Sequence, residues 1–256
     1  MRVEERLIEE MNLNAWPALH TVVYDGWLLR FTEGYSKRSN SVTPLYPSRL
    51  KDLAAKIYEC EAIYEQNGLN PVFKITPFDS SEGLDSILEQ HGYKSVDTTL
   101  VLTRGLGDPE HKTHLPDALP GHVTVDSKVS HDWLELLCKF GSLKTEYKDT
   151  AYRMLMASPL KMGFFTLYDA GEPAACGYCV IQAGYMGIYD IVSDPSRRRR
   201  GYGLSLLLSM LDWGRASGAE HAYLLVVESN HAARSLYGKL NFTQLYHYWY
   251  RVKQNE

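Results

Sequence analysis

Four consecutive arginines, Arg197–Arg200, stand directly before two glycines, Gly201 and Gly203. An apolar run of the kind that forms strands precedes them, and the leucines that follow recur at the spacing of one buried helix face. The pattern predicts a strand, a loop and a helix N-terminus, where unpaired backbone N–H groups and a partial positive charge favour an anion. Glycine lets a ligand approach the backbone closely. We therefore expect this stretch to bind a diphosphate.

Two common nucleotide-binding loops do not fit these residues. A P-loop needs a Lys followed by Ser or Thr, and no such pair follows Gly203. The dinucleotide fingerprint needs a third glycine or an alanine where the chain has Leu206. The segment 198–203 has the form R-x-x-G-x-G and follows Pro195, and it resembles the acetyl-CoA-binding motif of the GNAT acyltransferase superfamily. A solvated basic turn without a ligand is the alternative.

A second motif lies further along the chain. Its residues are Val226-x3-Asn230-x2-Ala233-x2-Leu236-Tyr237-x4-Phe242. It resembles the GNAT pattern V-x3-N-x2-A-x2-L-Y-x3-G-F, except that Asn241 stands where glycine is usual. Asn is the next best residue for a left-handed backbone position. The resemblance implies that the following residues bind the cofactor: Ile191, Val192, Ser193, Arg198, Arg199, Arg200, Gly201, Tyr202, Gly203, Leu204, Ser205, Asn230 and Tyr237.

The resemblance also implies roles for these groups. The amides near 199–205 would hold the pyrophosphate, and the backbone of 191–193 would bind the pantetheine arm as an added strand. A backbone N–H there would polarise the thioester carbonyl. Tyr237 would protonate the departing thiolate, since thiols and phenols have reference pKa values of about 8.5 and 10; a core aromatic is the alternative. Asn230 would contact pantetheine, cap its helix, or do both.

The residue that accepts the proton of the nucleophile is harder to assign. Relatives often carry a carboxylate at positions that correspond to Gly187 and Leu225, neither of which titrates. The nearest acids are Asp190 and Glu228, and Glu228 is the candidate catalytic base. For both acids a surface or capping role is the alternative, and a water chain can replace a base.

Composition limits the classes of function. The chain has 256 residues, 45% of them hydrophobic, which suits a globular protein of two domains. The net charge of −4 gives no reason to expect nucleic acid. The sequence shows neither a secretory segment nor an apolar run long enough to span a membrane, so we expect a cytoplasmic protein. Its four cysteines are too few for a disulfide scaffold, and Cys176-x-x-Cys179 has no second pair, so no metal is expected.

Along the chain the patterns change twice. We predict a GNAT-like domain without a cofactor motif over 1–104, a linker over 105–121 and a catalytic GNAT domain over 122–256. In the first domain, Asp25-Gly26 predicts a hairpin turn, and Ser48 is the expected N-cap of a helix that begins near Leu50. In the second domain the predicted order is β-α-α-β-β-β-α-β-α-β, which matches the GNAT fold.

The two halves show a weak internal repeat. Residues 87–104 align without gaps on 236–253, both running from a helix end into a strand. Duplication of a GNAT-like unit is one interpretation, and the other is that short helix-turn-strand units look alike. The first half has Tyr46-Pro47-Ser48 where a cofactor loop would stand, so we expect it to have lost cofactor binding.

These observations predict an α/β protein with the GNAT fold, a mixed sheet flanked by helices. The expected function is an N-acetyltransferase that moves the acetyl group of acetyl-CoA directly to a primary amine. A non-catalytic acyl-CoA-binding or sensor protein is the alternative, and a nucleic-acid-binding module using Arg197–Arg200 is a weaker third. The acceptor amine stays open, as does the oligomeric state, with a homodimer among the options.

Overall fold

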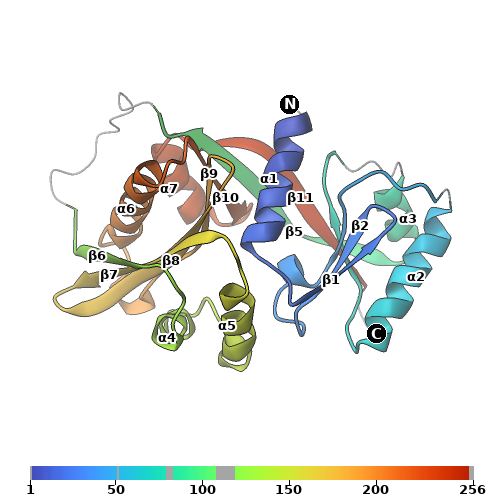
Figure 1. Cartoon of the computed structure of the whole chain (residues 1–256), viewed down its shortest axis with the longest axis horizontal. Helices are drawn as coiled ribbons and strands as arrows, with labels where there is room; N and C mark the ends of the chain where they lie inside the picture. Colours follow the sequence, from blue (N-terminus) through green and yellow to red (C-terminus); the bar gives the residue numbers. More distant parts are fainter. Residues whose placement is uncertain (1, 51, 79–82, 108–118, 254–256) are drawn as a thin grey trace. The chain divides into compact units, whose positions relative to one another are not determined.

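The computed structural model of the chain describes residues 2–50, 52–78, 83–107 and 119–253 (Figure 1). The chain forms two compact units. Unit 1 consists of Met1–Leu100, Val227–Ser229 and Leu245–Glu256, and unit 2 consists of Val101–Val226 and Asn230–Gln244. Each unit is a layer of strands with helices packed against it. The predicted α/β class is therefore confirmed.

Unit 1 is built mainly from the first half of the chain. Its elements are α1 (Arg2–Ala15), β1 (His20–Tyr24), β2 (Trp27–Phe31), η1 (Lys37–Ser39), β3 (Val42–Pro44), α2 (Leu53–Gln66), β4 (Val72–Ile75), α3 (Leu84–Gln90), most of β5 (Tyr93–Gly105) and most of β11 (Thr243–Lys253). The strand order is β1-β2-β3-β4-β11-β5. Strands β3 and β4 are parallel, whereas β4 and β11 are antiparallel, so the sheet is mixed.

The hairpin predicted at Asp25-Gly26 is confirmed, because β1 and β2 pair on either side of a two-residue turn. Both turn residues have positive φ, 44° and 84°, as the tight hairpin turn requires. The predicted N-cap Ser48 is wrong. The cap of α2 is Asp52, whose carboxylate accepts the N–H of Ala55 at 3.0 Å, and the Ser48 hydroxyl donates to Asp25 instead. The sequence pattern around Ser48 could not predict this contact, because Asp25 lies on a turn 23 residues earlier in the chain.

The two faces of unit 1 differ in chemistry. On one face, apolar residues of α2 and α3 such as Ile57 and Leu88 pack on Phe73 and its strand neighbours. On the other face, Glu9 of α1 forms a buried ion pair with Lys74 and accepts the hydroxyl of Tyr246 at 2.7 Å. Phe73 and Lys74 are adjacent in β4, and alternate residues of a strand point to opposite faces.

Unit 2 carries the motifs singled out in the sequence. Its elements are the end of β5, β6 (His122–Asp126), α4 (His131–Lys139), η2 (Thr145–Tyr147), α5 (Lys148–Met156), β7 (Lys161–Asp169), β8 (Glu172–Gln182), β9 (Tyr185–Ser193), η3 (Pro195–Arg197), α6 (Tyr202–Ala216), β10 (His221–Val227) and α7 (His231–Lys239). The strand order is β5-β10-β9-β8-β7-β6, with β9 and β10 parallel. With β11, the order along the chain is the predicted β-α-α-β-β-β-α-β-α-β.

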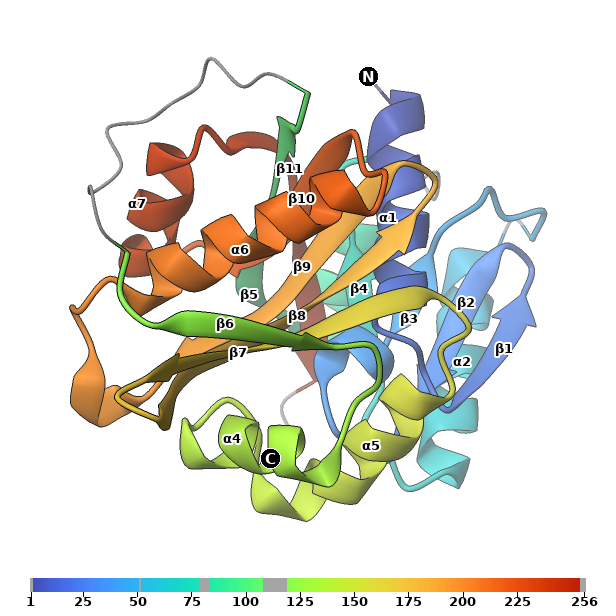
Figure 2. The ribbon, with the colours of Figure 1, turned by 60° about the vertical axis from the view of Figure 1, so that its left-hand side comes forward.

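Helices cover both faces of the strands in unit 2 (Figure 2). On one face, Trp133 of α4 packs edge-on against Phe164 and Tyr178 and donates its ring N–H to the carbonyl of Phe165 at 3.1 Å. On the other face, Trp213 of α6 packs against the Phe165 ring. The sheet therefore anchors α6 through Trp213, near the C-terminal end of the helix.

The units and the predicted domains differ at two strands. The last residues of β5, 101–105, belong to unit 2, whereas residues 245–253 of β11 belong to unit 1. Residues of β11 belong to unit 1 because β11 pairs with β4, from Trp249 opposite Ile75 to Val252 opposite Val72. Of the predicted linker 105–121, residues 108–118 lie outside the described part of the chain. The end of β5 thus belongs to the unit formed mainly by the second half of the chain, and most of β11 belongs to the unit formed mainly by the first half.

Candidate functional site

Strand β9 is irregular just before the arginine loop. Opposite Gly177 of β8, the register of β9 shifts by one residue, and Asp190 takes a left-handed φ of 50°. This is a β-bulge, which bends a strand and redirects its backbone groups. The parallel ladder with β10 ends at the pair Ile188–Leu224, although β9 continues to Ser193. Beyond that pair, the edge of β9 is available to an extended ligand rather than to β10.

The loop after β9 is held by two aspartates. Asp194 accepts the N–H of Ser196 at 2.9 Å and the Ser196 hydroxyl at 2.7 Å, which closes the turn through Pro195. Arg197 forms an ion pair with Asp169, at the end of β7. The Tyr202 hydroxyl donates to the same carboxylate at 2.5 Å. These contacts tie both ends of the arginine loop to the β7–β8 turn.

The centre of the loop faces solvent. Arg198, Arg199 and Arg200 are exposed, and left-handed φ values occur at Arg199 (63°) and Gly201 (82°). Successive N–H groups in such alternating conformations form a concavity that binds anions. Gly201 precedes α6 without a side-chain cap, so the first N–H groups of the helix lack an intrahelical partner and add to the positive end.

Gly203 tests whether a phosphate group fits here. Its φ is not left-handed, and an added Cβ would meet only Leu236, at an ordinary 3.6 Å. Nothing in the surrounding protein therefore requires glycine at this position, although glycine weakens a helix. A glycine at the second position of α6 leaves open the space that a ligand would enter. The arrangement fits the pyrophosphate of a CoA-type cofactor.

Ser205 differs from the other predicted cofactor contacts. Its N–H donates to Gly201 at 3.0 Å as part of the helix, and its hydroxyl donates to the Pro120 carbonyl at 3.0 Å. Both of its donors are thus used within the chain. Tyr202 is also buried, whereas Leu204 is half-buried.

Helix α7 carries the second motif. Asn230 caps it by accepting the N–H of Ala233 at 3.1 Å, as predicted for one of its two roles. Asn241 has a φ of 59°, which confirms the left-handed turn at this position. Tyr237 is buried beside Phe242, and burial raises the pKa of its phenol to about 12. Leu236, the preceding residue, reaches Gly203, so α7 lies against the start of α6 (Figure 2).

The sequence matches a family described as "Probable histone acetyltransferase Rv0428c C-terminal" over residues 3–251. The chain belongs to this acetyltransferase family. It is also 28% identical over 249 residues to the uncharacterized N-acetyltransferase YobR of Bacillus subtilis (strain 168), covering 97% of this chain and 98% of YobR.

Solved structures show the same fold. A GCN5-related N-acetyltransferase from Kribbella flavida superposes with a TM-score of 0.71 at 15% identity, over 100% of this chain and 96% of that one. A tandem GNAT protein from the clavulanic acid biosynthesis pathway gives 0.65 at 11% identity, over 97% and 89%. The GNAT fold is thereby confirmed, and a tandem GNAT protein shares it over nearly the whole chain. The protein is a GNAT-type acetyltransferase.

At Gly187, one of the two positions that the resemblance links to a base, the adjacent side chain is a tyrosine. An added Cβ at Gly187 would lie 2.6 Å from the Tyr223 hydroxyl. That hydroxyl is also 2.9 Å from the hydroxyl of Tyr189, and both rings are buried. Glu228 belongs to unit 1, where its N–H donates to Thr98 at 2.8 Å and its side chain is exposed. The Tyr189–Tyr223 pair was missed in the sequence, because residues 34 positions apart meet only across β9 and β10.

Asp169 was also missed. It adjoins an open groove of about 510 Å³ that is lined by Gly121, His122, Thr124, Tyr168, Asp169, Ala170 and Gly171. The Tyr202 hydroxyl lowers the pKa of the Asp169 carboxyl, with help from Arg197. The one available signal was an acid at the end of a strand, just before the turn at Gly171.

Neither a membrane-spanning helix nor a cluster of metal ligands occurs in the described part of this acetyltransferase. None of its described helices is both long and apolar enough to cross a membrane. Within the same residues, no group of three or more His, Cys, Asp or Glu side chains is arranged to hold a metal ion.

Proposed function

We propose that this acetyltransferase uses acetyl-CoA as donor and a primary amine as acceptor, with direct transfer between them. The observation that carries the proposal is Gly203, a glycine in the first turn of α6 that the fold itself does not need. It stands in the motif R-x-x-G-x-G, in the first turn of a helix whose N-terminal N–H groups favour an anion. Acetyl-CoA, when bound, supplies an activated acyl group on a thioester.

The donor would lie along two features of unit 2. Backbone amides of 199–204, with Arg198, Arg199 and Arg200 around them, would hold the pyrophosphate. The free edge of β9 at Ile191, Val192 and Ser193 would hydrogen-bond the pantetheine arm, because the ladder with β10 has already ended. A backbone N–H at the bulge would then stabilise negative charge on the carbonyl oxygen under attack.

Tyr237 is the proposed proton donor to the leaving thiolate. Its phenol is buried, and with a pKa near 12 it stays protonated at every pH at which the protein is expected to work. Because a thiol has a pKa of about 8.5, complete transfer from this phenol is uphill, so the phenol would share its proton with the sulfur as the C–S bond breaks, and solvent would supply the proton that the thiol keeps. The amine proton would pass to Glu228 or to water, with Asp190 as the second acid.

Calorimetric titration with acetyl-CoA tests the donor site. We expect one tight site in the wild type, and at least a 30-fold loss of affinity in Gly203→Asp, because a carboxylate would occupy the phosphate space. Ser209→Asp, at a partly buried position further along α6, is the matched control and should bind as the wild type does. A folded wild type that does not bind acetyl-CoA contradicts the proposal.

The word N-acetyltransferase in the relatives' descriptions supports an amine acceptor and does not say which amine. A small metabolite, an antibiotic, a peptide N-terminus and a lysine side chain all present one. The family description names a histone acetyltransferase, so lysine-containing peptides belong in the first screen for thiol release. We expect the activity to be cytoplasmic.

A further inference from the structure

The loop over 45–50 in unit 1 has the same topological position as the arginine loop in unit 2. In unit 1, β3 runs into this loop, α2 follows, and β4 returns parallel to β3. In unit 2, β9, the arginine loop, α6 and β10 repeat that order, again with parallel strands. Each loop therefore joins the first strand of a β-α-β unit to the start of its helix, where backbone N–H groups favour an anion.

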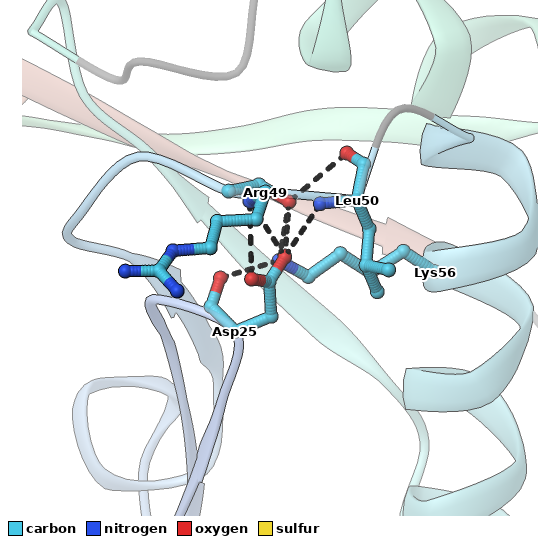
Figure 3. Close-up of polar contacts among 5 residues, drawn as sticks. Asp25, Arg49, Leu50 and Lys56 are labelled. Carbon is cyan, nitrogen blue, oxygen red and sulfur yellow. Dashed lines mark hydrogen bonds and ion pairs between the residues drawn. The ribbon is translucent and has the colours of Figure 1, made fainter.

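The loop of unit 1 already holds an anion, the carboxylate of Asp25 (Figure 3). One carboxylate oxygen accepts the N–H of Arg49 at 3.0 Å. The other accepts the N–H groups of Arg49 and Leu50, each at 3.1 Å, and the hydroxyl of Ser48. Two successive backbone amides and a hydroxyl thus converge on one carboxylate, as they would on a phosphate oxygen.

A buried cation lies beside the same Asp25 carboxylate. Lys56, in the first turn of α2, is fully buried, and its ammonium lies 3.1 Å from the Asp25 carboxylate and 3.0 Å from the Ser48 hydroxyl. It also donates to the Asp25 carbonyl at 2.8 Å. A buried ammonium is stable only beside a compensating anion. The Ser48 hydroxyl, then the amides of Arg49 and Leu50, hold the pKa of the Asp25 carboxyl well below its usual range.

The turn that carries Asp25 is inserted into the loop. A Cβ at Gly26 would lie 2.7 Å from the carbonyl oxygen of Tyr46 and 2.8 Å from that of Pro47. The Gly26 carbonyl also accepts the N–H of Tyr46 at 2.9 Å. Glycine at this position therefore serves both the turn and the close approach that brings the Asp25 carboxylate to the loop amides.

We propose that the loop over 45–50 is an oxyanion cradle that the chain fills with its own Asp25. The Asp25 carboxylate excludes phosphate groups from this loop of unit 1. The chain is then left with one acetyl-CoA site, in unit 2, and this second statement rests on the proposed function. Removing the carboxylate opens the cradle to a small oxyanion, for which inorganic phosphate is the probe.

The test is made in the full-length Gly203→Asp background, in which the arginine loop is blocked. Asp25→Gly removes the side chain and suits the left-handed φ, whereas Asp25→Asn is the matched control that removes charge but keeps the volume. Unfolding is followed against inorganic phosphate at constant ionic strength. We expect Asp25→Gly to gain roughly 3 to 5 °C in Tm at ten times its Kd, and the parent and Asp25→Asn to gain nothing.

Two outcomes overturn the proposal. A folded Asp25→Gly protein without a phosphate-dependent rise in Tm overturns the proposal and leaves Asp25 as a purely structural tie. If that variant does not fold, Asp25→Ser, which is shorter and uncharged, is given the same measurement with the same criteria. Two acetyl-CoA sites per wild-type chain also overturn it, whereas no acetyl-CoA site contradicts only the proposed function, because the phosphate measurement does not involve unit 2.

Discussion

Tyr237 shows how one side chain acquires a chemical role from its surroundings. It lies near the end of a short helix, buried against Phe242, next to a residue that contacts Gly203. Burial raises the pKa of its phenol to about 12, because the charged form would be poorly solvated. The same burial that makes it a core residue thus keeps the proton it is proposed to donate.

Tyr237→Phe should lower kcat by about 100-fold, because it removes a proton donor while preserving the ring. The Kd for acetyl-CoA should change less than about threefold, since the hydroxyl is not expected to hold the donor's phosphates. Steady-state kinetics with calorimetry measures both. Because the pKa is raised, wild-type activity should show no loss from Tyr237 ionisation between pH 7 and about 10.

A second variant tests which group accepts the proton of the amine. If Glu228 takes the amine proton, Glu228→Gln removes the acidic limb of the pH–rate profile as well as lowering kcat. An unchanged profile excludes Glu228 and leaves Asp190 or a water chain. A kcat for Tyr237→Phe equal to that of the wild type would exclude Tyr237 as the donor.

Among the elements, the arginine loop is held in place by a contact from elsewhere in the chain, the clamp formed by Asp169 with Arg197 and Tyr202. Asp169, at the end of β7, accepts from both Arg197 and Tyr202, one on each side of the exposed arginines. The clamp fixes the loop while Arg198, Arg199 and Arg200 stay in solvent. Arg197 is therefore a positioning residue, whereas its three neighbours are available to phosphate.

Asp169→Asn should weaken acetyl-CoA binding by about fivefold, because a neutral amide holds Arg197 less firmly than a carboxylate does. The pKa of Asp169 is lowered, so the carboxylate is charged throughout the neutral range. The loss should accordingly be constant from pH 6 to 8. Asp149→Asn breaks a comparable ion pair with Arg153 on α5 and should leave binding unchanged. Equal affinities for all three proteins would exclude a role for the clamp.

At the scale of the molecule, β11 is the last strand of the chain, yet most of it packs in unit 1, which is built mainly from the first half of the sequence. Arg251 of β11 pairs with Asp85 of α3 through two contacts, at 2.7 and 2.8 Å, and donates to the Tyr93 carbonyl at 3.2 Å. Trp249 donates to the same carboxylate at 2.9 Å. The last strand is therefore fastened to unit 1 by charge as well as by its ladder with β4.

Arg251→Met should lower the free energy of unfolding by about 2 kcal/mol, because it removes a largely buried cation while Asp85 keeps access to water. Urea unfolding followed by tryptophan fluorescence measures this. Arg251 lowers the pKa of Asp85, so the stabilisation is present above about pH 4 and is lost as pH falls further. The gap between the two proteins should close in acid. Arg153→Met, at an exposed pair, should change stability little.

The sequence by itself determined the local elements and predicted the class of ligand that we propose. The glycines, arginines and helix period around 197–211 predicted a strand, an anion-binding loop and a helix, because those preferences act within a few residues. Asn241 in a left-handed turn and the hairpin at Asp25 followed in the same way. Only the tertiary structure decided which groups meet across the sheet: Asp169 with Arg197, Tyr189 with Tyr223, Asp25 with the loop at Ser48. Those pairs are far apart in the chain, and strand pairing alone brings them together.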